Sequence, residues 1–224
     1  MTAAVADSLS IWLRVRREAD WRGAPDLRPL PVDRDGFRCW CAGPVRRRDP
    51  VRAERLLAAY ASAREDAALR APLDFALLAG WQCRVLGTPE APFRRGDAYA
   101  KGGRERYGLT PRTRAAFESC LRAATDPDLP AAARAARAAL DVAFFHPFAD
   151  GNARASLLVL VHVLAREGIV LPEVGPLLTT RYADDPAGAA DLALLIGLLH
   201  RGRTGPHRRR PGAADQVPAR SPSP

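Results

Sequence analysis

Apolar residues recur at helical spacing along much of the chain, in stretches that Pro, Gly and Asp residues separate. Residues 50–69 carry an apolar stripe that fits an amphipathic helix, with Asp49 as a candidate N-cap. A second helix is predicted from Pro72 to about Gly87, and a third over residues 113–124. These patterns predict a mainly helical chain.

The two most apolar helices flank a short polar loop. Residues 131–144 are rich in Ala and contain no Gly or Pro, and Pro130 suits a first turn. Residues 155–165 are apolar on almost every side, so this helix belongs in the middle of a core. A last helix is predicted after Asp184-Asp185-Pro186. Residues 145–154 are therefore expected to form a loop held between two buried helices.

Two segments interrupt the helical pattern. Residues 87–110 contain short runs bounded by Gly, which indicate a hairpin or an irregular flap. Residues 37–42 follow Asp35-Gly36 and are predicted to form a strand after a turn. Residues 1–49 as a whole are interpreted as an N-terminal extension packed on the core. Three tryptophans are expected to be its packing residues rather than a stacking platform for bases: Trp12, Trp21 and Trp40.

The chain has 224 residues, which suits one main domain with appendages, and we place this domain at residues 50–200. The formal net charge is +9, but residues 201–224 contain six Arg and one Asp, so +5 of it lies there. A mildly basic domain with a basic, disordered tail is therefore the preferred interpretation, ahead of a protein that binds nucleic acid specifically.

Cysteine spacing and hydropathy exclude several classes of protein. Cys39 and Cys41 are separated by one residue, which is not zinc-finger spacing, and no second pair completes a site. No signal-peptide core and no apolar run of membrane length occurs in the sequence. We expect a cytoplasmic protein with reduced thiols and no membrane partner, while secretion without a cleaved signal stays open.

The loop at residues 145–154 has the sequence Phe-His-Pro-Phe-Ala-Asp-Gly-Asn-Ala-Arg, and its side chains suit phosphate chemistry. Gly151 lets the backbone turn just before a helix N-terminus, which attracts anions. Asp150 offers a hard oxygen ligand of the kind that Mg²⁺ accepts. Arg154 offers a planar fork for phosphate oxygens. His146 can take a proton near neutral pH, which an attacking hydroxyl must lose.

The alternative interpretation of this loop is a helix-capping turn whose His and Arg face solvent. The composition argues against it, because Asn152 is the only Asn in a chain that also has a single Lys. A composition that replaces Asn everywhere else has left one Asn in this loop. Phe148 is interpreted as a buried plug that anchors the loop.

The loop resembles the signature of Fic enzymes, His-Pro-Phe-x-Asp/Glu-Gly-Asn-Gly/Lys-Arg, with Ala153 as the one departure. The resemblance implies an all-α core with a small β-hairpin flap, and a transferase that moves AMP from ATP to a Ser, Thr or Tyr hydroxyl of a target protein. It implies Mg²⁺ as the cofactor and ATP as the co-substrate. Carried over by position, His146 is the catalytic base and Asp150 holds the metal. The residues that position the phosphates would be Gly151, Asn152 and Arg154.

In Fic proteins a hairpin flap upstream of the signature binds the target chain as an added edge strand. The corresponding residues here would be Ala98, Tyr99, Ala100 and Lys101. Phe93-Arg94 resembles the aromatic–Arg pair that often precedes this flap. An ordinary surface hairpin is the alternative.

One departure from the family leaves the reaction open. Many members that transfer AMP carry a second Arg three residues after the first, and here that position is Leu157. We therefore expect ATP to gain little affinity from its γ-phosphate. Doc-type proteins also lack this Arg and transfer the terminal phosphate, but they carry Lys where this chain has Ala153. A Doc-like protein kinase is thus the second candidate, and a non-catalytic Fic-fold binding module is the rival from another class.

Control of the activity also departs from part of the family. Autoinhibited members carry Ser/Thr-x-x-x-Glu-Gly/Asn. This chain has Glu167-Gly168, but the residue four positions before Glu167 is Val163, not Ser or Thr. The motif is absent from the sequence. Activity in isolation, or a small inhibitory partner protein, are the two possibilities that this leaves.

Overall fold

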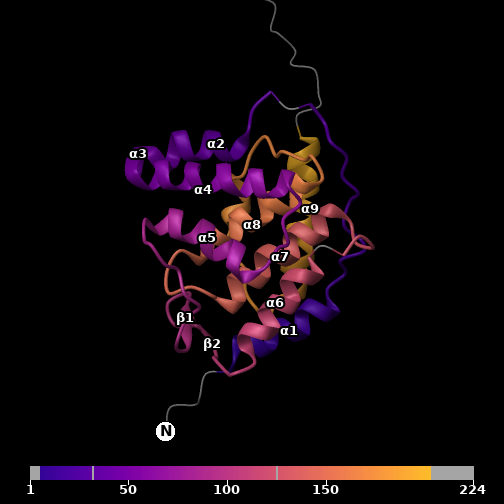
Figure 1. Ribbon diagram of the computed structural model, residues 1–224. Coiled ribbons are helices and arrows are strands. Elements are labelled where there is room, and N and C mark those ends of the chain that lie inside the picture. The colour runs from indigo at the N-terminus through magenta and orange to yellow at the C-terminus, as the bar shows by residue number, and fades with distance from the viewer. Residues whose placement is uncertain (1–5, 32, 125, 203–224) are drawn as a thin grey trace, which may run out of the picture.

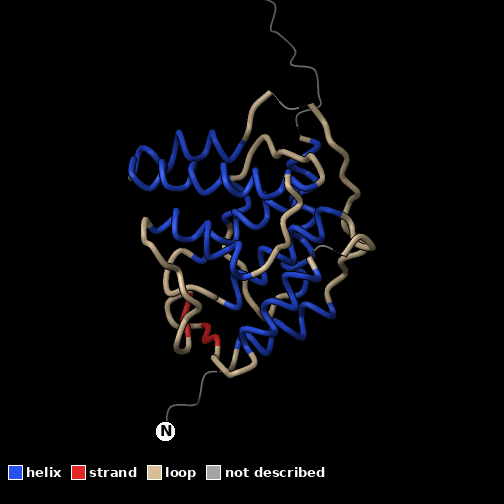
Figure 2. Tube along the Cα trace, in the orientation of Figure 1, coloured by secondary structure: helices blue, strands red, loops and turns tan. Residues whose placement is uncertain are grey.

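The computed structural model describes residues 6–31, 33–124 and 126–202 (Figures 1 and 2). As predicted, the fold is all-α with one small hairpin. Residues 203–224, most of the expected basic tail, lie outside the described residues. The elements are α1 (Ser8–Glu18), α2 (Gly36–Trp40), the π-helix η1 (Cys41–Val45), α3 (Arg46–Arg48), α4 (Pro50–Ala68), α5 (Phe75–Leu86), β1 (Ala98–Ala100), β2 (Glu105–Tyr107), α6 (Thr113–Ala123), α7 (Ala131–Phe145), α8 (Asn152–Arg166), the 3₁₀-helix η2 (Gly175–Leu178) and α9 (Pro186–Arg201).

Helix α8 lies at the centre of the fold. It packs against α7 and α4, while α5 packs on α4 and α9 packs on α7 (Figure 1). Every residue from Leu157 to Leu164 is buried, on all sides of the helix. The prediction that this apolar helix belongs in the core is confirmed, and the loop before it is therefore held by buried elements at both ends.

Local capping signals set most helix boundaries. The Asp49 carboxylate accepts a hydrogen bond from the Arg52 amide at 2.9 Å, so α4 begins where the sequence predicts. Helix α5 begins at Phe75, and the predicted start at Pro72 is wrong. The reason is Asp74, whose carboxylate accepts a hydrogen bond from the Leu77 amide at 2.8 Å and caps the helix there.

The predicted strand at residues 37–42 is wrong, because this segment is helical. The Asp35 carboxylate accepts a hydrogen bond from the Arg38 amide at 3.1 Å and acts as an N-cap rather than as a turn residue. Gly36 serves a close approach between segments, since a Cβ atom there would lie 2.4 Å from the backbone nitrogen of Glu173. The helix α2 then continues into η1 and α3, which lead directly to α4.

The N-terminal helix α1 joins the same hydrophobic core as the rest of the chain. Trp12 is fully buried, and its ring centroid lies 4.8 Å from that of Phe144 on α7. Its indole N–H donates to the Asp141 carboxylate at 3.0 Å. Trp21 is buried too and Trp40 is partly buried against the core, so all three tryptophans pack as expected.

Within the described part of the chain, no helix has both the length and the apolar character that crossing a bilayer requires.

Candidate active site

Two left-handed residues shape the loop between α7 and α8. Helix α7 ends at His146, whose φ is 49°, and α8 begins after Gly151, whose φ is 78°. A Cβ atom on Gly151 would lie 2.3 Å from Nε2 of Gln82. Gly151 is therefore required by its backbone conformation and by the space around it.

Phe148 and Asn152 fix the interior of the loop. Phe148 is 2% exposed and stacks on Phe75 with the ring centroids 5.5 Å apart, which confirms the predicted plug. The Asn152 side chain accepts from the Phe148 amide at 3.0 Å and donates to the Phe148 carbonyl at 2.8 Å. Asn152 thus holds the loop backbone in place, and any effect of its side chain on bound phosphates acts through that backbone.

The His146 imidazole is placed to act as a base. Its Nδ1 lies 2.8 Å from the Ala143 carbonyl oxygen. Because a carbonyl only accepts, Nδ1 carries the proton and Nε2 carries the free lone pair. Burial lowers the pKa of His146, and the positive charges of Arg94 and Lys101 lower it further. The ring is therefore neutral at pH 7.

Asp150 and Arg154 lie at the N-terminus of α8. The Asp150 side chain is 77% exposed, and its carboxylate accepts from Nη2 of Arg154 at 3.0 Å. An ion pair this exposed contributes little stability, so phosphate or a cation can displace it. The unpaired amides of the first helical turn add positive potential at the same place.

A single accessible carboxylate fits a magnesium site that phosphate oxygens and water complete. Mg²⁺ in nucleotide enzymes commonly takes one or two carboxylates and keeps several waters. Asp150 can supply this carboxylate, since its side chain is 77% exposed. One of its oxygens accepts from Arg154 and the other from the Gly151 amide at 2.6 Å. The described residues contain no cluster of three or more His, Cys, Asp or Glu that could hold a metal without phosphate ligands.

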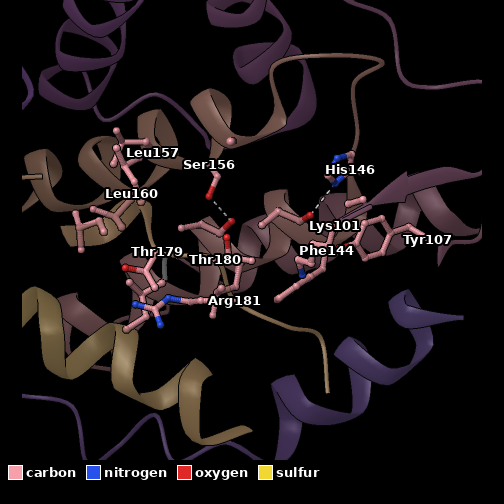
Figure 3. A pocket seen from close by; sticks show the side chains of 18 residues that line it. Lys101, Tyr107, Phe144, His146, Ser156, Leu157, Leu160, Thr179, Thr180 and Arg181 are labelled. Carbon is pink, nitrogen blue, oxygen red and sulfur yellow. Dashed lines mark hydrogen bonds between the residues drawn. The ribbon is translucent and has the colours of Figure 1, made fainter. Parts of the chain in front are cut away.

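A mainly apolar cavity of about 260 Å³ lies beside His146, between the flap, α7, α8 and α9 (Figure 3). Leu157 is 4% exposed and belongs to the apolar wall of this cavity. The position at which many family members carry the second Arg is therefore part of an apolar wall here. The polar residues that line the cavity besides His146 and Tyr107 are Lys101, Ser156, Thr179, Thr180 and Arg181.

Residues 88–164 of the chain match the Fic/DOC family. Over this segment the chain is similar to the Fic/DOC family. The matched segment runs from the residues before the flap into α8, so it includes every candidate catalytic and flap residue. Comparison with curated proteins and with solved structures gives no match.

The flap is a two-stranded antiparallel hairpin in which Ala98 pairs with Tyr107. The outer side of β2 is partly covered, because Arg106 forms a parallel bridge with Asp7. Among the described residues, β1 has no strand partner on its other side, and Tyr99 is 62% exposed there. The predicted target-binding residues at 98–100 therefore form a free strand edge.

Lys101, the fourth predicted flap residue, lies in the turn after β1 with a φ of 57°. Its side chain folds inward, and its ammonium group lies 4.7 Å from the ring centre of Phe144 and 4.9 Å from that of Tyr182. It also pairs with the carboxylate of Glu105. Lys101 thus faces the cavity rather than the free edge of the flap.

Arg94 links the flap to the loop at residues 145–154. It is 8% exposed and donates to the carbonyl oxygens of Phe145 at 3.2 Å, of Gly108 at 3.0 Å and of Gly96. Its own amide donates to the Pro147 carbonyl at 2.8 Å. The Phe93-Arg94 pair noted in the sequence therefore contains a structural arginine that holds the flap in position relative to His146.

Sequence reasoning missed two residues that hold the site. Gln82 is fully buried and donates to the Asp150 carbonyl at 2.6 Å, which supports the loop from α5. A polar residue on the apolar face of that helix was the available signal. Glu105 is 4% exposed and accepts from the Ala183 amide at 2.9 Å, so it anchors β2 to the segment before α9. A charged residue in a three-residue strand carries no comparable signal.

Proposed function

We propose that this protein transfers AMP from ATP to a Ser, Thr or Tyr hydroxyl of a target protein. The observation that carries the proposal is the pairing of a neutral His146, with a free Nε2, and the anion-attracting N-terminus of α8. Asp150 and Arg154 lie at that N-terminus, where a metal ligand and a phosphate-binding cation are needed.

The proposed placement of the nucleotide follows the polarity of the site. The adenine ring of ATP lies in the apolar cavity beside His146, since apolar surfaces favour a flat ring system. The α-phosphate lies over the first turn of α8, and Arg154 faces the β-phosphate. Mg²⁺ held by Asp150 neutralises charge on the phosphates when bound.

The proposed reaction is a displacement at the α-phosphorus. Nε2 of His146 takes the proton from the target hydroxyl, and the oxygen then bonds to the α-phosphorus. The bond from the α-phosphorus to the oxygen that bridges it to the β-phosphorus breaks, and pyrophosphate leaves with its developing charge facing Arg154. The protein contributes mainly position and charge, as is usual in phosphate transfer.

The free edge of β1 supports a protein as the acceptor. An extended target segment can add to Ala98–Ala100 as a third strand, which fixes its backbone without reading its sequence. The fixed segment would present one hydroxyl side chain towards His146. A small inhibitory partner protein remains part of the proposal, as one way to control the reaction.

A Doc-like kinase is the second candidate. Leu157 is the observation that favours it, since this chain and Doc-type proteins both lack the second Arg. Incubating the protein with a lysate and ATP labelled separately at the α- and γ-phosphate distinguishes the candidates. We expect label from the α-phosphate on protein. Label from the γ-phosphate alone would show phosphorylation, and no label from either would favour a binding module.

Replacing Asp150 with Asn should weaken nucleotide binding in the presence of Mg²⁺ by about tenfold or more, because a charge-assisted contact contributes about 1.5–3 kcal/mol. Affinity measured in EDTA should change little. Calorimetric titration with and without Mg²⁺ checks this. Asp128→Asn, at an exposed site between α6 and α7, is the matched control and should behave as wild type. An Asp150→Asn protein that keeps its full magnesium dependence would refute the metal assignment.

The pH dependence of the rate should report the lowered pKa of His146. The base acts only when neutral, so the rate should rise with pH and level off, with its midpoint below the ordinary histidine value of about 6.5. Lys101→Met removes one of the positive charges that lower this pKa, and should therefore move the midpoint to higher pH. Initial rates between about pH 5 and pH 8 test both statements. A wild-type midpoint above 6.5 would contradict them.

A further inference from the structure

Arginines from outside the family signature surround the far side of the α8 N-terminus. A hollow of about 420 Å³ is lined by Arg48 and Arg52 together with Asp150 and Arg154. A second hollow of about 250 Å³ is lined by Arg55 and by the same Arg52, Asp150 and Arg154. The two hollows therefore adjoin each other at the metal and phosphate residues.

This arginine-lined groove is continuous with the cavity beside His146. Ala153 and Leu178 line both that cavity and the 420 Å³ hollow. A ligand can thus extend from His146, over the first turn of α8 and past Arg154, to the start of α4. The polarity along that path matches that of a nucleoside triphosphate, which has a largely apolar base at one end and highly charged phosphates at the other.

The charge of the groove suits the terminal phosphates. The four arginines that line the two hollows face the carboxylates of Asp49 and Asp150, which leaves a formal excess of two positive charges. ATP with one Mg²⁺ carries two negative charges in excess at neutral pH. The groove and its proposed ligand therefore compensate each other.

The guanidinium groups have donors to spare. The Arg48 side chain makes no hydrogen bond or ion pair with any residue that the structure describes, and it is exposed. Arg52 lies 3.4 Å from an oxygen of Asp49, and Arg55 donates to the Leu86 carbonyl at 3.0 Å. Each guanidinium has five N–H donors, so most of them remain for phosphate.

We propose that Arg48 and Arg52 bind the terminal phosphate of ATP and take the place of the second family Arg that Leu157 replaces. This inference rests on the proposed function and identifies how the same site recognises a triphosphate. It reverses one expectation from the sequence. ATP should gain affinity from its γ-phosphate after all, from arginines about 100 residues before the signature rather than from the helix that follows it.

The test compares ATP, ADP and AMP binding by calorimetry in Mg²⁺, for wild type and for the Arg48→Gln/Arg52→Gln double variant. Wild type should bind ATP about tenfold or more tightly than ADP, the value of one charge-assisted contact. The double variant should lose most of this preference and keep its affinity for AMP. Binding rather than transfer is measured, so the result does not depend on finding the target protein.

Arg47→Gln is the matched control, because Arg47 is an exposed neighbour that does not line the groove. It should keep the wild-type preference for ATP, and all variants should keep the wild-type melting temperature, since these side chains are exposed. An unchanged preference in the double variant, an equal loss in Arg47→Gln, or equal ATP and ADP affinities in wild type would overturn this inference alone. Failure of wild type to bind any of the three nucleotides would overturn the proposed function with it.

Discussion

Replacing His146 with Ala should lower the rate of transfer by about 10²–10⁴-fold, the usual contribution of a general base. Affinity for nucleotide and Mg²⁺ should remain, because the imidazole acts on the incoming hydroxyl and not on the phosphates. Transfer of label from ATP, measured beside nucleotide binding on the same preparation, checks both parts. A variant that keeps most of the wild-type rate would remove His146 from the mechanism.

The backbone at this position calls for a second variant. His146 has a φ of 49°, a conformation that Ala adopts less readily than Asn does. His146→Asn therefore removes the base with less strain on the loop, and should lose as much activity as His146→Ala. If only the Ala variant were inactive, the loss would come from a distorted loop rather than from a missing base.

Replacing Arg16 with Ala should lower the free energy of unfolding by about 3–5 kcal/mol, the usual cost of leaving a buried charge without its partner. The Arg16 guanidinium donates to the fully buried Asp141 carboxylate at 2.8 Å, and also to the Cys120 carbonyl at 3.1 Å. Urea unfolding at pH 7 measures the loss. Arg17→Ala, one residue along the same helix and exposed, is the control and should change stability by less than about 0.5 kcal/mol.

The Arg16→Ala defect should also depend on pH, with a sign that the burial of Asp141 fixes. Burial already raises the pKa of Asp141, and Arg16 opposes that rise. Without Arg16 the folded-state pKa rises further above the unfolded value, so the lost stability returns as Asp141 is protonated. The deficit against wild type should therefore shrink between neutral and acidic pH. A deficit that is constant over this range would show that the loss comes from packing alone.

Asp141 lies on α7, about 1.4 turns before His146 at the end of that helix, so this buried pair also fixes the helix that presents His146. The sequence contained no signal for it. Arg16 and Asp141 are 125 residues apart, and neither residue type is expected at a fully buried position on its own. Only the packing of α1 against α7 brings them together.

The helical framework was predictable because its signals are local. Asp49 and Asp185 cap helices by accepting amide hydrogen bonds three residues ahead, and the apolar face of each helix repeats at the period of the helix itself. The Asp35-Gly36 prediction failed for the complementary reason. The same pair suits a turn or a helix start, and in the structure Asp35 caps a helix by accepting from the Arg38 amide, while Gly36 packs against the backbone at Glu173.

The loop at residues 145–154 was predictable for a different reason, since the side chains of the proposed site are consecutive in the sequence. From His146 to Arg154 the proposed base, the carboxylate, the turn glycine and the proposed phosphate-binding cation occur within nine positions. The sequence by itself therefore determined the all-α class, the flap and the residues on which the proposed chemistry rests. It did so because hydrogen bonds and periodicity within a segment do not depend on distant parts of the chain.

The surroundings of that loop were decided only by the tertiary structure. Gln82 and Arg94 support the loop and flap, and Leu157 lines the apolar cavity. Arg48 at the end of α3 and Arg52 in the first turn of α4 line a hollow together with Arg154 of α8. Each of these residues gains its role from a neighbour many positions away. The partner of a buried polar side chain and the pKa of the group beside it follow from three-dimensional packing, and a residue pattern along one segment does not identify them.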